Sequence, residues 1–333
     1  MMISHKSQVT SHKFIDKKNK IIFVVGPTAV GKTEVAVRLA GKINAEIISC
    51  DSMQVYKGMD IITSKPTPIL RKKTPHHLIN IVPPTREYNV SRYRQEALKK
   101  IKEIFKKGKI PLFVGGTGLY MSILVDGIFK AGPQSKSIRK RLYKEAKRLG
   151  SEYLYRRLQQ VDPAAAAKIH PNDTKRIIRA LEVFQICGKP ISQLQKERKG
   201  LFDEYEVRFF CLNMERDKLY GRIEKRIDKM FNHGLLAEVK KLLKLRLSKT
   251  ASCAIGIREL KEYLEGLYDL EEAKRLMKKN TRNYAKRQLT WFRKDKRIEW
   301  LEIGDKETPM QVAERIVEKL KNCDLRHSAL STK

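Results

Sequence analysis

The chain has 333 residues and carries 71 Lys and Arg against 37 Asp and Glu, which gives a formal net charge of +34. Hydrophobic residues make up 41% of the chain, so it can build a core and is not a disordered polycation, and it has no apolar run of the roughly 18 residues needed to cross a membrane. The excess of positive charge favours a polyanionic partner, with nucleic acid first and an anionic membrane surface second, although a Lys-rich proteome would also produce it.

The N-terminal part of the chain follows the order strand, loop, helix, strand. Residues 1–19 are polar and basic and predict a disordered arm without a secretory signal. Residues 21–25 are apolar and β-branched, which is typical of a buried parallel strand. A glycine-bounded turn follows at 26–32, then a helix at 33–42 and a second strand at 46–49. This order predicts the start of a doubly wound α/β domain.

A second unit of the same kind follows a proline-rich stretch. Residues 60–90 contain five prolines and predict ordered loops and turns. Ser91 is the expected N-cap of a helix at 93–107. An apolar strand at 110–114 then leads through Gly-Gly-Thr-Gly into an apolar helix at 119–125. Since both glycine-bearing loops follow parallel strands, they should meet at the carboxyl edge of one sheet, where open α/β sheets bind ligands.

The pattern changes in the middle of the chain. A long segment of basic helical pattern without a strand is followed by a strand at 206–214, and the remainder is helical. We therefore expect an α/β fold with a parallel sheet flanked by helices, which the phosphate-binding motif at 26–33, described below, makes P-loop NTPase-like. Its core (20–127 and 206–321) is interrupted by an all-helical insertion domain at 128–205, and residues 322–333 predict a disordered tail.

The cysteines and histidines do not suggest a metal site. The five cysteines are dispersed without a Cys-x-x-Cys pair, and the one His-His pair, at 76–77, is expected at the surface or beside a substrate. Free cysteines predict a reducing compartment, so we expect a cytoplasmic protein without structural zinc.

Residues 26–33, Gly-Pro-Thr-Ala-Val-Gly-Lys-Thr, fit the pattern G-x-x-x-x-G-K-[ST] of nucleotide-binding and ATP-binding loops. The glycines let backbone N–H groups point at an anion, and the following helix adds its positive N-terminal end. Lys32 offers a charge to the outer phosphate and the Thr33 hydroxyl can ligate Mg²⁺. The loop recognises a polyphosphate, so a kinase and a transferase with an alkyl diphosphate donor look alike here.

A carboxylate, Asp51, directly follows the second predicted strand. At the sheet edge it can hold Mg²⁺ or accept a proton from a nucleophile, although a turn or N-cap role is the alternative. Ser52 and Gln54 offer donors and acceptors for a purine edge, and Met53 and Tyr56 offer apolar and stacking surface.

Five blocks of sequence occur in the order typical of one enzyme family. They are Gly-Pro-Thr-Ala-x-Gly-Lys-Thr at 26–33, Asp-Ser-Met-Gln-Val-Tyr-Lys-Gly-Met-Asp-Ile at 51–61, Gly-Gly-Thr-Gly-Leu-Tyr at 115–120, Ile-His-Pro-Asn-Asp at 169–173 with Arg-Ala-Leu-Glu-Val at 179–183, and Ala-Lys-Arg-Gln-Leu-Thr-Trp-Phe-Arg at 285–293. In these blocks the chain resembles the tRNA dimethylallyltransferase (tRNA isopentenyltransferase) family, in its bacterial type without a zinc finger.

The resemblance implies a prenyl transferase that moves a dimethylallyl group from dimethylallyl diphosphate to N6 of the adenosine just 3′ of the anticodon, giving N6-(dimethylallyl)adenosine with the help of Mg²⁺. It implies a P-loop core and a helical insertion that grips the anticodon stem-loop of tRNA. We expect a monomer without a membrane partner. Because the target base is stacked in the loop, we expect it to be flipped into a channel.

The resemblance also implies roles for individual residues. Asp51 resembles the general base, with Lys32 and Thr117 as further catalytic residues. The implied diphosphate contacts are Gly26, Thr28, Ala29, Val30, Gly31, Lys32, Thr33, Arg222 and Arg226, with Thr33 also matching the Mg²⁺ site and the choice between the two arginines left open. The implied tRNA contacts are Asp51, Ser52, Met53, Gln54, Thr117, Arg139, Lys175, Arg176, Arg179, Arg258, Arg282, Lys286 and Arg287.

Two segments concentrate the positive charge. Residues 136–160 hold nine Lys or Arg against two Glu, and residues 278–297 hold nine against one Asp. At helical spacing each segment places several cations in one stripe, and Tyr284 and Trp291 are expected on the opposite side, toward a core. Like charges this close destabilise a helix, so the stripes favour phosphate partners, and hence RNA, over a solvated face.

Three other functions remain open. A small-molecule P-loop kinase uses the same loop but needs no basic helices. An adenylate isopentenyltransferase, which acts on free nucleotides, should lack the basic insertion. A non-catalytic RNA-binding ATPase module would bind RNA without consuming an allyl diphosphate.

Overall fold

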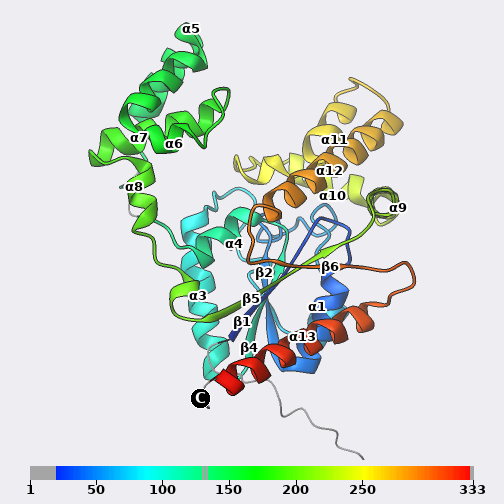
Figure 1. Cartoon of the computed structure of the whole chain (residues 1–333). Coiled ribbons are helices and arrows are strands. Elements are labelled where there is room, and N and C mark those ends of the chain that lie inside the picture. The colour runs from blue at the N-terminus through cyan, green and yellow to red at the C-terminus, as the bar shows by residue number, and fades with distance from the viewer. Residues whose placement is uncertain (1–19, 130–131, 133, 331–333) are drawn as a thin grey trace, which may run out of the picture. The chain divides into compact units, whose positions relative to one another are not determined.

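The computed structural model describes residues 20–129, 132 and 134–330 (Figure 1). The chain divides into two compact units, one made of residues 1–124 and 204–333 and the other of residues 125–203. These boundaries fall within three residues of the predicted limits of the insertion, 128 and 205. The predicted disordered arm, residues 1–19, lies outside the described residues.

The larger unit is built on a six-stranded, all-parallel sheet with the order β3-β2-β4-β1-β5-β6. The strands are β1 (Lys20–Val25), β2 (Ala45–Cys50), β3 (His76–His77), β4 (Ile110–Gly115), β5 (Glu206–Asn213) and β6 (Glu299–Glu302). Every residue of β1 is buried, and Phe23 stacks on Phe113 of β4 and Phe209 of β5 with ring centroids 4.6 and 5.2 Å apart. The predicted α/β fold with a parallel sheet is confirmed.

The helices of this unit cover both faces of the sheet, and some of them form a group that packs mainly together. They are α1 (Lys32–Ile43), α2 (Pro68–Lys73), α3 (Val90–Lys106), α4 (Gly118–Val125), α9 (Arg216–Asn232), α10 (Leu235–Leu243), α11 (Ile257–Leu264), α12 (Leu270–Phe292) and α13 (Pro309–Leu330), with a 3₁₀ turn η2 at Ala251–Cys253. In Figure 1, α1 and α13 pack together on one side of the sheet, and α3 lies on the other. The group that packs mainly together is α9 to α12, in which α12 packs against α9 and α11.

The structure differs from the sequence-based expectations at several element ends. Helix α3 begins at Val90, and its N-cap is Asn89, whose side chain accepts the Arg92 N–H, so the assignment to Ser91 is wrong. Strands β3 and β6 and helix α2 were not expected, because each is short and carries charged or imidazole side chains. Helix α13 continues to Leu330, whereas the sequence predicts a disordered tail from residue 322. The buried side chains of its first turns hold the helix on the core, and nothing breaks it before residue 330.

The smaller unit is all-helical, as expected for the insertion. It contains α5 (Lys136–Val161), α6 (Pro163–Ala166), α7 (Thr174–Cys187), α8 (Ile191–Lys196) and the 3₁₀ turn η1 (Leu201–Asp203). Helix α5 bends at Gly150, which has a φ of +83°. The unit has its own core, in which Leu142, Leu154 and Leu158 of α5 pack with the apolar face of α7.

Within the described parts of both units, no helix is long and apolar enough to cross a membrane.

Candidate active site

The phosphate loop, residues 26–33, connects β1 to α1 as expected. Gly26 has a φ of +142°, and a side chain there would place its Cβ 2.5 Å from the Leu212 carbonyl oxygen on β5. Gly31 has a φ of +101°. Both positions therefore require glycine, because the backbone is left-handed at Gly31 and crowded at Gly26. Ala29 also has a positive φ, +68°, so the loop holds one strained non-glycine residue.

Lys32 folds back across this loop. Its Nζ donates to the carbonyl oxygens of Gly26, at 2.9 Å, and Pro27, at 2.7 Å. Burial lowers the pKa of Lys32 to about 8, and the Asp51 carboxylate opposes that shift. A bound anion would favour the charged form of the same amine.

A cavity of about 600 Å³ opens above the loop. Its walls come from the phosphate loop, the loop after β2, helix α9 and the segment between β6 and α13. The predicted site residues that line it are Thr28, Ala29, Val30, Gly31, Lys32, Thr33, Asp51, Gln54, Arg222 and Arg226. Residues far apart in the sequence are thus brought to one place at the carboxyl edge of the sheet, as the topology requires.

The two arginines of α9 approach the loop differently. Nη2 of Arg226 donates to the Thr28 hydroxyl at 2.7 Å, and Nη1 of Arg222 donates to the Val30 carbonyl at 3.3 Å. Burial lowers the pKa of Arg226, opposed by the nearby Asp51 carboxylate, and its buried Nε has no hydrogen-bond partner among the described residues. Arg222 is exposed. A buried N–H donor without a partner needs an acceptor, which a water molecule or a bound anion would supply.

Asp51 forms a turn at the cavity wall. Its Oδ1 accepts the backbone N–H groups of Met53, at 2.8 Å, and Gln54, at 3.3 Å. Asp51 therefore does stabilise a turn, which was the alternative to a catalytic role. The turn fixes the carboxylate in the lining of the cavity. Gln54 is held in turn, because its Oε1 accepts the Ser49 hydroxyl at 3.0 Å.

The second glycine loop lies against the acidic one. The Thr117 hydroxyl accepts the Ser52 N–H at 3.1 Å, and the Thr117 N–H donates to the Cys50 carbonyl at 3.2 Å. A Cβ on Gly115 would lie 2.0 Å from the Cys50 carbonyl oxygen, so only glycine allows this approach. The structure thus brings Thr117 and Ser52 together.

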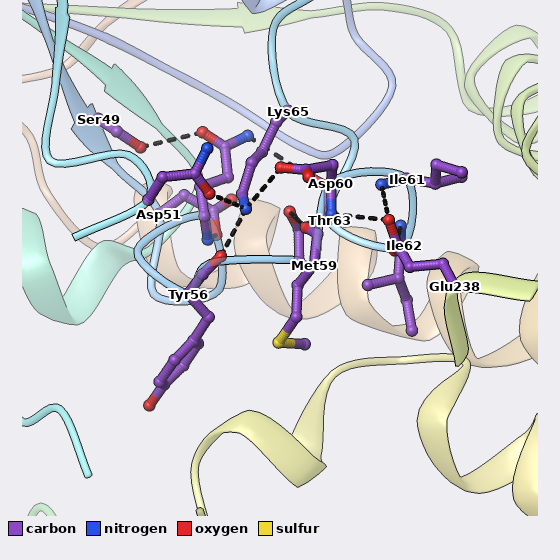
Figure 2. A network of polar contacts seen from close by, with 12 residues as sticks. Ser49, Asp51, Tyr56, Met59, Asp60, Ile61, Ile62, Thr63, Lys65 and Glu238 are labelled. Carbon is purple, nitrogen blue, oxygen red and sulfur yellow. Dashed lines mark hydrogen bonds and ion pairs between the residues drawn. The ribbon is translucent and has the colours of Figure 1, made fainter. Parts of the chain in front are cut away.

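The loop that continues from Asp51 is held by two charged side chains, the buried Lys65 and the half-buried Glu238 (Figure 2). Lys65, with a side chain that is 2% exposed, donates to Asp60 Oδ1 at 2.9 Å and to the Tyr56 carbonyl and Asn80 Oδ1. Glu238 of α10 accepts the backbone N–H groups of Asp60, Ile61 and Ile62, each at 2.9 Å. Neither Lys65 nor Glu238 was identified from the sequence.

Gln288 of α12 was also missed, although it stands inside the block at 285–293. Its Oε1 accepts the Thr28 N–H at 2.8 Å, and its Nε2 donates to the Gly116 carbonyl at 2.9 Å. The signal was the helical spacing of Thr281, Ala285, Gln288 and Phe292, which form the buried stripe of α12. A glutamine on a buried stripe needs polar partners.

The expected tRNA contacts fall into two groups. On the larger unit, Arg258, Lys286 and Arg287 are exposed, while Arg282 pairs with Glu224. Trp291 is 36% exposed, so the expectation that it faces a core is wrong; its indole instead covers Gly118, where a Cβ would lie 2.1 Å from Cδ1.

On the smaller unit, Lys175 and Arg176 are exposed, and Arg176 pairs loosely with Asp173. Arg139 and Arg179 both bind the buried carboxylate of Glu182, at 2.9 and 2.7 Å. Arg139 therefore joins α5 to α7, whereas the Arg179 contact lies within α7, in addition to any contact with RNA.

Comparisons with known proteins converge on one family. The model of the IPP transferase family matches residues 54–295, and that of isopentenyl transferases matches residues 19–79. The tRNA dimethylallyltransferase of Carboxydothermus hydrogenoformans is 49% identical over 300 residues, which cover 90% of this chain and 96% of that protein.

Two solved structures are similar as well. The full-length tRNA isopentenylpyrophosphate transferase of Bacillus halodurans has 39% sequence identity and a TM-score of 0.67, with 93% of this chain and all of that chain covered. A eukaryotic dimethylallyltransferase acting on tRNA has 31% identity and a TM-score of 0.77, with 90% of this chain and 78% of that chain covered. The sequence comparisons and the structure comparisons therefore point to the same family.

Proposed function

Because the chain belongs to the IPP transferase family of tRNA dimethylallyltransferases, it is a prenyltransferase that modifies tRNA, and we propose that it transfers the dimethylallyl group of dimethylallyl diphosphate to N6 of the adenosine just 3′ of the anticodon. The observation that carries this proposal is one cavity lined by Lys32, Arg226 and Asp51. It combines cations for a departing diphosphate with a carboxylate for the proton of the attacking amine.

Between the two arginines, we assign the diphosphate contact to Arg226. Its guanidinium is buried beside Thr28, and its Nε has no partner among the described residues, so an anion in the loop would satisfy it. Arg222 is exposed and donates to a loop carbonyl, which suits a supporting contact at the rim. Lys32 and the amides of the loop supply the remaining donors.

The residues of the cavity fit a magnesium ion. No cluster of three His, Cys, Asp or Glu exists among the described residues, but Mg²⁺ in phosphate sites takes only one or two protein oxygens and completes its shell with phosphate and water. Thr33 lines the cavity, and its hydroxyl would hold the ion. When bound, Mg²⁺ would neutralise charge on the leaving diphosphate.

The reaction that this site supports is a displacement at the allylic carbon. A bond forms between N6 and that carbon, the carbon–oxygen bond to the diphosphate breaks, and the electron pair leaves with the diphosphate. Asp51 accepts the proton that N6 loses. For N6 to reach the donor, the adenine must leave its stack, which costs a few kcal/mol and is cheaper in a loop than in a duplex. The product is N6-(dimethylallyl)adenosine.

The anticodon stem-loop is assigned to the basic surfaces. The exposed Lys286 and Arg287 on α12, and Lys175 and Arg176 on the smaller unit, support phosphate contacts, and the role of the smaller unit in gripping tRNA belongs to this proposal. We also propose that the protein works as a monomer in the cytoplasm.

One experiment tests the function against its alternatives. The protein is incubated with labelled dimethylallyl diphosphate and, separately, with an anticodon stem-loop, AMP or ATP. Label on the stem-loop adenosine is expected. Label on AMP or ATP alone would indicate an adenylate isopentenyltransferase. ATP hydrolysis or phosphoryl transfer without prenylation would indicate a kinase or an ATPase module.

A further inference from the structure

Gln288 connects three segments that are remote in the sequence. It lies on α12, 260 positions from Thr28 and 172 from Gly116, and is 5% exposed. Both ends of its amide are used, since Oε1 accepts the Thr28 N–H and Nε2 donates to the Gly116 carbonyl. One planar side chain thus ties the phosphate loop to the second glycine loop.

The helix around Gln288 is seated tightly on these loops. A Cβ on Gly116 would lie 2.0 Å from Gln288 Nε2, so this approach exists only because residue 116 is glycine. One turn further along α12, Trp291 covers Gly118 in the same way. The buried stripe of α12, with Ala285 and Phe292, fixes the helix that presents the amide. Gln288 is therefore held in place from both sides.

Thr28 is the residue on which this contact acts. Gln288 holds its backbone N–H, and Arg226 donates to its hydroxyl at 2.7 Å. The next residue, Ala29, has a left-handed backbone with a φ of +68°, a conformation that persists only when its surroundings enforce it. The Gln288 contact also determines which loop amides are left to face a diphosphate, because the Thr28 N–H is already occupied.

The other end of the Gln288 amide acts on the acceptor side. Gly116 precedes Thr117, whose hydroxyl accepts the Ser52 N–H in the loop that carries Asp51. A shift of the Gly116 carbonyl would therefore move Thr117 and, through Ser52, the carboxylate at the cavity wall. Gln288 thus spans the two halves of the proposed reaction, the leaving group and the base.

We propose that Gln288 is a positioning residue that holds the diphosphate loop and the loop of Asp51 at a set distance from each other. It touches neither substrate and acts through the Thr28 N–H and the Gly116 carbonyl. This role rests on the proposed function. The proposal assigns a donor-site role to a residue of α12, a helix whose other proposed contacts are with tRNA.

Two substitutions distinguish the hydrogen bond that Gln288 Oε1 accepts from the one that Nε2 donates. Gln288→Met keeps the length and removes both hydrogen bonds, and Gln288→Glu keeps an acceptor for the Thr28 N–H but places a carboxylate oxygen against the Gly116 carbonyl. The matched control is Gln95→Met, at an exposed position on α3. The readouts are direct binding of inorganic diphosphate by calorimetry, kcat and KM with the stem-loop, and hydrogen exchange of the Thr28 amide.

Gln288→Met should weaken diphosphate binding about tenfold, the effect of one lost buried hydrogen bond, and should lower kcat by a similar factor or more. Its Thr28 amide should exchange faster than in the wild type. Gln288→Glu should bind diphosphate more nearly like the wild type but lose kcat, because only the acceptor side is displaced. The control should match the wild type in every readout.

The proposal is overturned if Gln288→Met leaves diphosphate affinity and kcat within twofold of the wild type, or changes only the KM for tRNA. If Gln288→Met does not fold, Gln288→Glu decides alone, and an unchanged kcat there rejects the proposal. A wild-type protein that labels no stem-loop would reject the proposed function instead. Diphosphate binding and Thr28 exchange are measured without any transfer, so the two failures remain distinguishable.

Discussion

Arg226 and Thr28 lie 198 positions apart in the chain, yet the guanidinium Nη2 of Arg226 donates to the Thr28 hydroxyl at 2.7 Å. This contact joins helix α9 to the phosphate loop and places a half-buried cation in the lining of the cavity. The neighbouring Arg222, one helical turn away, reaches only the Val30 carbonyl from an exposed position. The sequence does not distinguish the two arginines, but in the fold they differ in their contacts and in their exposure.

The first prediction compares these two arginines. Arg226→Met should raise the KM for dimethylallyl diphosphate and lower kcat together, by about 10² in kcat/KM, because a buried charge-assisted contact contributes about 1.5–3 kcal/mol. Arg222→Met should change kcat/KM by no more than about tenfold. Steady-state kinetics with a saturating stem-loop measure both. A larger loss for Arg222→Met than for Arg226→Met would reverse the assignment.

The second prediction concerns the carboxylate. Asp51→Ala should keep tRNA binding while transfer drops by about 10²–10⁴, the usual range for loss of a general base. Asp51→Asn should preserve the turn to Met53 and Gln54, since an amide oxygen accepts the same N–H groups, but should be as slow in transfer. Single-turnover labelling of a bound stem-loop measures the step. Full activity in Asp51→Asn would show that the carboxylate only builds the turn.

The third prediction concerns Glu238, which accepts three backbone N–H groups of the loop after Asp51. In Glu238→Gln one acceptor oxygen becomes an NH₂ group that faces N–H donors, so part of this network is lost. Because Gln54 Nε2 donates to Thr63 in that loop, at 3.5 Å, we expect a higher KM for the stem-loop and unchanged binding of inorganic diphosphate.

The matched control for this prediction is Glu271→Gln, which changes a side chain that is 79% exposed on the first turn of α12. It should leave both measurements at the wild-type level. If Glu238→Gln raised the KM for the stem-loop and weakened diphosphate binding by the same factor, the loop would act on the whole site and not on the acceptor side alone.

Much of this fold was accessible from the sequence because its signals are local. The apolar run of β1 favours a buried strand, and the glycines at 26 and 31 permit the tight turn that follows it. Contacts made at long range were not accessible. The helical spacing of Gln288 indicates a buried position, but it does not show that the partners of its amide are Thr28 and Gly116. Strand β6 has too few residues to show a strand pattern.

The fourth prediction concerns stability in acid. Burial alone would raise the pKa of Glu46, but hydrogen bonds from Lys109, His77 and Lys107 outweigh burial and lower it to about 2. A lowered pKa means that the charged form contributes stability above about pH 4.5, and that this contribution is lost as pH falls from there toward 2. The contribution is at most about 3 kcal/mol.

The measurement is the free energy of unfolding of the wild type and of Glu46→Gln at pH 7 and pH 3. Other paired carboxylates, such as Glu307, also lose their ion pairs in acid. The contribution of Glu46 is therefore the difference in free energy of unfolding between the wild type and Glu46→Gln. The gap between wild type and variant should shrink at pH 3. A gap that stays constant would show that Glu46 contributes through packing and not through its charge.

The fifth prediction follows from Lys32. Burial lowers its pKa to about 8, while Asp51 raises it, Arg226 lowers it, and Cys211 and Glu34 raise it in smaller measure. The free protein therefore loses this charge as pH rises through about 8, and with it an attraction for the diphosphate. We expect kcat/KM for dimethylallyl diphosphate to fall above that pH, approaching tenfold per pH unit. The value of kcat should change less, because bound diphosphate raises the pKa of the amine.

The test is the pH profile of Lys32→Met, whose kcat/KM should be low at every pH and should not fall further near pH 8. A fall in kcat/KM with the same pH midpoint in Lys32→Met would show that another group causes it.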